Sequence, residues 1–178
     1  MAFHPFRRSP SNYANRSNHY NNYNNYPLMM GPYTRIVGKH PYGTPPYYAI
    51  VQTGGVCDAP TKKTRVAAIL KPSVLDHLQM RVFTVENASS LTEAKWHSVL
   101  RGLELALEEG ETSVALEHDN LGVVHGLITP LMQFRHEYAR YYKEQILSTA
   151  RHVEWVGARW IPREFNRADA LFKEYPLV

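Results

Sequence analysis

The amino-acid sequence predicts an α/β domain with a mixed five-stranded sheet, in which three antiparallel strands precede alternating strands and helices that flank the sheet. Two observations lead to this fold class. Three short apolar segments follow one another with brief polar connections, which is typical of an antiparallel meander. The rest of the chain alternates strand-like and helix-like patterns, and such crossovers require parallel pairing.

The three strands of the meander are expected at residues 47–53, 66–70 and 81–85. The first, "YYAIVQT", runs into Gly54 and Gly55, which we interpret as the start of a turn. Pro72 closes the second strand, and β-branched and aromatic residues mark the third. The order of these segments predicts two consecutive hairpins.

The next segment, "SLTEAKWHSVLRGLELALEEG" from Ser90 to Gly110, has the pattern of an amphipathic helix. Its apolar residues recur at the helical period. Ser90 and Glu93 have the spacing of a capping box, and Gly110 is a natural stop. We therefore expect a helix that covers one face of the sheet.

The C-terminal half predicts two further strands and their helices. We expect a strand at 113–118, a short turn or helix at 120–127, a second long helix from Pro130 to about residue 149, and a strand at 152–158. The stretch 165–175 is expected to be helical and to stop before Pro176.

Residues 1–46 differ in composition from the rest of the 178-residue chain. They are rich in Asn, Tyr and Pro and contain no Asp or Glu, and the first acidic residue is Asp58. Such a segment has too little aliphatic surface to offset its ordering entropy. We predict a disordered tail at 1–46 and one folded domain at 47–178.

Three interpretations of this tail remain open. Its tyrosines could stack on single-stranded bases while Arg7, Arg8 and Arg16 contact phosphates. It could instead become ordered on a protein partner, or it could be a linker without a role. A cleaved organelle transit peptide is a further alternative, although the Asn/Tyr run and the lack of an amphipathic pattern disfavour it.

Overall composition bounds the remaining classes. A net charge of +4 and a pI near 9.2 are mildly basic, which only weakly suggests nucleic acid. The single cysteine, Cys57, excludes an internal disulfide framework and a Cys-based zinc site, and it is compatible with an intracellular reducing compartment. No apolar run approaches the roughly 18 residues of a membrane span, so we expect no membrane partner.

Three carboxylates stand at strand ends or helix starts, namely Glu93, Asp119 and Asp169. Each has a structural explanation, because Glu93 can complete the capping box, Asp119 can cap the next helix, and Asp169 follows Asn166 at capping-box spacing. Together they could hold divalent cations of the kind that clamp the attacking and leaving oxygens of a phosphodiester. Such oxygen ligands suit Mg²⁺ or Mn²⁺.

The chain resembles the ribonuclease H-like superfamily over residues 47–175, in its strand order and in "SSLTEAKWHSVLRGLELAL", "VALEHDN" and "WVGARWIPREFNRADALF". The last segment is most similar to the plant and retroelement type. The resemblance implies that Glu93, Asp119 and Asp169 are catalytic metal ligands. The fourth ligand position of the family falls on Thr53, or on Gln52 if the register slips by one, which implies a degenerate metal site.

The resemblance also implies nucleic-acid partners, RNA or an RNA–DNA hybrid. The residues expected to contact them are Arg7, Arg8 and Arg16 in the tail and Arg159, Arg163 and Asn166 in the domain. Neither Arg159 nor Arg163 matches the histidine of the family's mobile loop. Protein partners could bind through the tail.

Three functions follow as hypotheses. The first is a non-catalytic ribonuclease H-like domain, without a cofactor, that acts as an RNA-binding or scaffolding module within a ribonucleoprotein assembly. The second is an active endonuclease that uses Mg or Mn to cleave RNA in RNA–DNA hybrids. The third is an unrelated α/β binding protein that only shares the pattern.

Overall fold

The computed structural model describes residues 32–38, 43–58, 60–61, 63–74, 77–85 and 88–174. Residues 1–31, which contain Arg7, Arg8 and Arg16, lie outside the described residues, so the disorder predicted for them stays a prediction. In chain order, the elements are β1 (Thr34–Gly38), β2 (Ala49–Asp58), β3 (Lys63–Lys71), β4 (Gln79–Val85), α3 (Leu91–Glu108), β5 (Ser113–His118), α4 (Leu121–Ile128), α5 (Glu137–Ala150), β6 (Trp155–Trp160), the 3-10 helix η4 (Arg163–Phe165) and α6 (Ala168–Glu174).

The strands form one mixed sheet in the order β1-β6-β5-β2-β3-β4. Strands β2, β3 and β4 pair antiparallel, whereas β5 pairs parallel with both β2 and β6. This arrangement confirms the predicted α/β class and the meander. The sheet has six strands instead of the expected five, because β1 adds antiparallel to the edge strand β6.

Strand β1 lies within the segment 1–46 that the sequence analysis assigns to the disordered tail. Its five residues, "TRIVG", are too short to show a period. Ile36 and Val37 pack against the main core, so this strand belongs to the folded domain. The sequence pattern missed it because pairing with β6, and not local composition, stabilises it.

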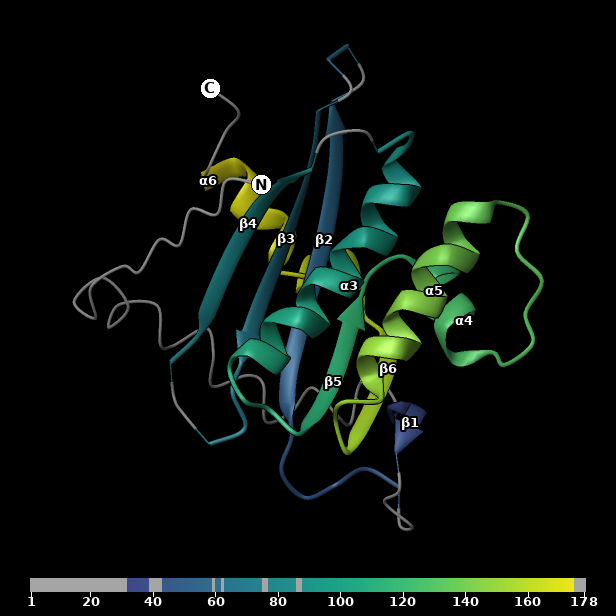
Figure 1. Ribbon diagram of the computed structural model, residues 1–178. Coiled ribbons are helices and arrows are strands. Elements are labelled where there is room, and N and C mark those ends of the chain that lie inside the picture. Colours follow the sequence, from purple (N-terminus) through teal and green to yellow (C-terminus); the bar gives the residue numbers. More distant parts are fainter. Residues whose placement is uncertain are drawn as a thin grey trace.

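Helices cover the two faces of the sheet unequally. Helix α3 packs on β2 and β3, α4 packs on β6 and β1, and α5 packs on α3, whereas α6 contacts β2 and β3. Figure 1 shows α3, α4 and α5 in front of the sheet and α6 behind it. No helix in the described part of the chain is long and apolar enough to cross a membrane.

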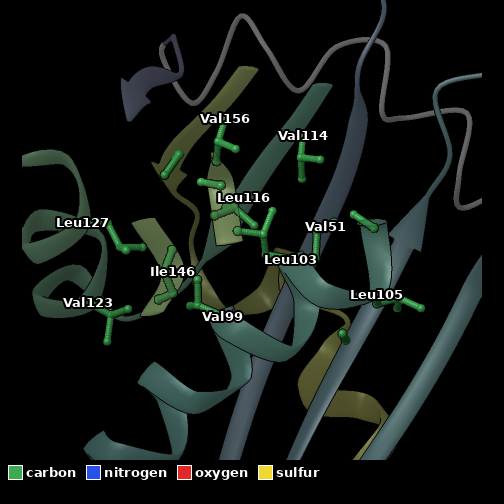
Figure 2. Close-up of a cluster of buried hydrophobic side chains, with 14 of the residues drawn as sticks. Val51, Val99, Leu103, Leu105, Val114, Leu116, Val123, Leu127, Ile146 and Val156 are labelled. Atoms are coloured by element: carbon green, nitrogen blue, oxygen red, sulfur yellow. The ribbon is translucent and has the colours of Figure 1, made fainter. Parts of the chain in front are cut away.

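The main core lies between the sheet and the first group of helices. Figure 2 shows Val99 and Leu103 of α3, Leu116 of β5 and Ile146 of α5 converging on one another, and all four are buried. A smaller cluster lies under α6, where Leu171 and Phe172 pack on Ala67 and Ile69 of β3. The two clusters fix the sheet between α3 and α6.

The double glycine is not a turn. Strand β2 continues through Gly54 and Gly55 to Asp58, and both glycines pair with β3. Gly55 faces α3, where an added Cβ would lie 2.6 Å from the Ala94 backbone. Glycine is therefore required by the close approach of the helix and not by a reversal of the chain.

Helix boundaries follow the predicted caps in α3 but not in α5. The Ser90 hydroxyl accepts a hydrogen bond from the Glu93 amide at 3.1 Å, which confirms the predicted N-cap. Helix α5 begins at Glu137 instead of Pro130, and Leu131 has a φ of 49°, outside the helical region. The stretch from Pro130 to His136 is irregular, because it must join α4 to a helix that packs on α3.

Candidate functional site

Two carboxylates meet at one end of the sheet. Asp119 follows β5, and Asp169 lies in the first turn of α6. The buried side chain of Asn166 connects the two elements, since its Nδ2 donates to Asp119 Oδ1 at 3.3 Å and to the Thr53 carbonyl at 2.9 Å. The loop before α6 is thereby fastened to both β5 and β2.

The electrostatics of the two carboxylates differ. Burial raises the pKa of Asp119, but its contacts with His118 and Asn166 and the charge of Lys95 outweigh this effect and hold the pKa below its usual value. Burial, and then the charge of Asp119, raise the pKa of Asp169 above its usual value. The pair therefore behaves as two like charges in a partly desolvated site.

Asp119 is not the cap of the following helix. The Asn120 side chain accepts from the Val123 amide at 3.0 Å and caps α4 instead. His118, beside it, is buried, with its Nδ1 accepting from the Asn120 amide at 2.9 Å and its Nε2 3.5 Å from the Ser98 hydroxyl. Because Asn120 caps α4, the Asp119 carboxylate is not used as a helix cap.

The Glu93 carboxylate is hydrogen-bonded to a residue just before its own helix. Its carboxylate accepts from the Ser89 amide at 2.6 Å and also from the Ser89 hydroxyl, which returns it to the start of its own helix. Within the described residues, no group of three or more His, Cys, Asp or Glu side chains is arranged to hold a metal ion. Asp119 and Asp169 lie near enough for the charge of one to act on the other, whereas the Glu93 carboxylate is engaged by Ser89.

The position expected to carry the fourth ligand contains no acid. Gln52 donates to Glu117 Oε2 at 2.8 Å and accepts from the Arg167 amide at 3.1 Å. Thr53 is 1% exposed, and its methyl group packs against Gly102 of α3. Gly54, the next residue of β2, faces Asp169, because an added Cβ would collide with Asp169 Oδ1.

A row of buried polar side chains lies beside the site, and no local sequence pattern predicts the whole row. Gln52, Glu117 and Arg159 are direct neighbours across β2, β5 and β6. Glu117 is fully buried and accepts from Arg159 Nη2 at 2.6 Å and from the Tyr33 hydroxyl at 2.8 Å. A charged residue inside the strand pattern "VALEH" was the feature that could have indicated it.

The arginines expected at a nucleic-acid surface separate into two groups. Arg159 is 5% exposed and bound to Glu117. Arg163 has an 84% exposed side chain, with its Nε 3.5 Å from Asp169 Oδ2. Asn166 is buried and serves to fasten the loop.

The fold is that of ribonuclease H domains, as comparison with solved structures shows. Ribonuclease H1 from the halophilic archaeon Halobacterium salinarum NRC-1 is 19% identical, with a TM-score of 0.64 over 70% of this chain and 93% of that one. The N-terminal ribonuclease H domain of a Mycobacterium tuberculosis protein is 18% identical, with a TM-score of 0.62 over 72% and 92%. LC11-RNase H1, solved in complex with an RNA/DNA hybrid, is 17% identical, with a TM-score of 0.60 over 69% and 92%.

The family is established independently of these structures. The reverse transcriptase-like family matches residues 53–174, and the chain belongs to this family within the ribonuclease H-like superfamily. A comparison with curated proteins finds no match. The third hypothesis, an unrelated α/β protein, is therefore wrong.

Proposed function

We propose that this ribonuclease H-like domain binds RNA, alone or in a hybrid with DNA, without cleaving it. The composition of the acidic site carries the proposal. Asp119 and Asp169 lie together, but the β2 residues beside them are Gln52, Thr53 and Gly54, and none of these can supply an anionic ligand.

The donor set does not fit a pair of catalytic divalent ions. A two-metal site clamps both the attacking and the leaving oxygen, so each ion needs several oxygen ligands of its own. Here two carboxylates, Asp119 and Asp169, lie near enough for the charge of one to act on the other, and Glu93 would have to leave its contacts with Ser89 to join them. Mg or Mn therefore belongs to the alternative function only.

Charge and exposure support a role in binding. The exposed guanidinium of Arg163 lies beside Asp169, where it can reach a phosphate. In the tail, Arg7, Arg8 and Arg16 add positive charge without any nearby acid in the sequence. Contacts of this kind favour backbone recognition over base identity, which suits a scaffold within a ribonucleoprotein.

The alternative is an active endonuclease that cleaves RNA in hybrids. One observation favours it: burial, and then the charge of Asp119, raise the pKa of Asp169, and paired carboxylates with perturbed pKa values are frequent at functional sites. One ion held by these two groups, with Glu93 rotated toward them, would be the minimal centre.

A cleavage assay separates the two functions. We expect the full chain to bind a labelled RNA–DNA hybrid and leave it intact in Mg²⁺ or Mn²⁺. Cleavage that is lost in Asp119→Asn but kept in Glu144→Gln, a change on the exposed face of α5, would overturn the proposal.

A gain-of-function variant tests the position that the family resemblance indicates, on the face of β2 that packs toward α3 and not on the face where Gly54 meets Asp169. Thr53→Asp restores an acid at the position that the family resemblance indicates, although its side chain starts from the packed interface with Gly102. Cleavage of the hybrid in this variant alone would support a site that lost its activity through this one residue.

A further inference from the structure

We propose that Trp160 forms a base-stacking subsite for a nucleotide of single-stranded RNA, next to the carboxylate pair. This inference rests on the proposed RNA-binding function and names one contact that would produce it. Trp160 ends β6, in register with His118 at the end of β5. It therefore lies at the same end of the sheet as Asp119.

The ring of Trp160 is both held and accessible. Its indole Nε1 donates to the Asp119 carbonyl at 2.9 Å, which fixes the orientation of the ring. Trp160 nevertheless remains 42% exposed. A large aromatic side chain that is oriented by a hydrogen bond and left open to solvent loses little entropy when a flat base stacks on it.

The surroundings favour a nucleotide over an apolar partner. The Asp119 carbonyl accepts from Trp160, and its carboxylate accepts from Asn166. The charge of Asp119 also acts on Asp169, which contacts the exposed Arg163. Aromatic faces next to an arginine are the usual components of single-stranded nucleic-acid sites, because the ring stacks on the base while the cation meets the phosphate.

Intrinsic fluorescence can report on this subsite specifically. The chain contains three tryptophans, of which Trp96 and Trp155 are 3% and 1% exposed. Only Trp160 is accessible to a base. Stacking should therefore quench the fraction of the emission that comes from Trp160.

The experiment measures binding of a labelled oligouridylate of about 12 nucleotides, within the usual range of single-stranded sites. We expect Trp160→Ala and Trp160→Leu to weaken binding roughly 5- to 150-fold, as loss of one stacked base does. Trp160→Phe should retain most of the affinity, because phenylalanine can stack although it lacks the indole N–H. RNA should quench the wild-type emission but not that of Trp160→Phe.

The matched control is Tyr141→Ala, which removes another exposed aromatic, from α5, and should leave the affinity unchanged. If the wild type binds the oligouridylate and Trp160→Ala binds equally well, the stacking subsite is refuted while the proposed function stands. Equal losses in Trp160→Phe and Trp160→Leu would also refute stacking and assign the effect to the hydrogen bond with Asp119. If the wild type binds neither this RNA nor the hybrid, the proposed function itself fails.

Discussion

At the scale of single residues, the two adjacent glycines of β2 serve different neighbours. Gly54 leaves room for the Asp169 carboxylate, and Gly55 leaves room for the backbone of α3. Because successive residues of a strand face opposite sides of the sheet, one dipeptide admits α6 on one face and α3 on the other.

The first prediction concerns Gly55. Gly55→Ala places a methyl group 2.6 Å from the Ala94 backbone, which cannot rotate away as a flexible side chain could. We expect a loss of about 1–3 kcal/mol in the free energy of unfolding, measured by urea titration. Gly122→Ala, on the exposed side of α4, should change it by less than about 1 kcal/mol. Equal stability of Gly55→Ala and the wild type would contradict the close packing of α3 on β2.

The second prediction concerns the opposite pKa shifts of the two aspartates. The folded pKa of Asp169 is raised, so its ionisation costs stability as the pH rises through that pKa. The folded pKa of Asp119 is lowered, so its ionised form adds stability that is lost as the pH falls through that pKa. At neutral pH, Asp169→Asn should therefore stabilise the protein and Asp119→Asn should destabilise it, each by on the order of 1 kcal/mol.

The measurement is the free energy of unfolding of both variants and the wild type as a function of pH. The differences should shrink below about pH 3.9, the ordinary Asp pKa, where the unfolded chain is also protonated. Stability changes of the same sign at neutral pH would contradict the opposite pKa shifts of the two carboxylates.

At the scale of elements, the polar row Tyr33–Arg159–Glu117–Gln52 joins four segments of the sheet. It ties the residue before β1 to β6, β5 and β2, and Gln52 extends it to the Arg167 amide in front of α6. The row thus anchors both the edge strand and the helix that carries Asp169. It is also the reason why Gln52 is not free to act as a metal ligand.

The third prediction tests this row. Arg159→Met leaves the fully buried Glu117 carboxylate without its charged partner, which should cost about 3–5 kcal/mol in the free energy of unfolding. Adding Glu117→Leu removes the stranded charge and should recover most of that loss. Urea titration of both single variants and the double variant gives the coupling energy. If the two single losses simply add, the pair contributes no specific interaction.

At the scale of the whole molecule, the boundary between tail and domain matters for any experiment on the tail. Composition places it at residue 46, whereas β1 pairs with β6 in the sheet and the Tyr33 hydroxyl bonds to the buried Glu117. Composition reports on local segments, and an edge strand is stabilised by its partner. The five-residue sequence of β1 therefore does not predict its pairing with β6.

The fourth prediction follows from this boundary. Deletion of residues 1–31 should leave the free energy of unfolding unchanged. Deletion of 1–46 should lower it by at least about 2 kcal/mol, since Ile36 and Val37 pack against the core. If Arg7, Arg8 and Arg16 contact phosphates, the shorter deletion should also lower the salt slope of RNA binding by about two. An unchanged slope would leave the tail as a protein-docking segment or a linker.

The sequence by itself determined the class of fold, the meander, the N-cap of α3 and the family, because these depend on periodicity, on capping chemistry and on the order of motifs. It also placed Asp119 and Asp169 as candidate partners. Only the tertiary structure decided that Glu93 turns back to Ser89, that Arg159 is buried against Glu117, and that β2 continues through its glycines. These outcomes depend on contacts between segments far apart in the chain, which no local pattern encodes.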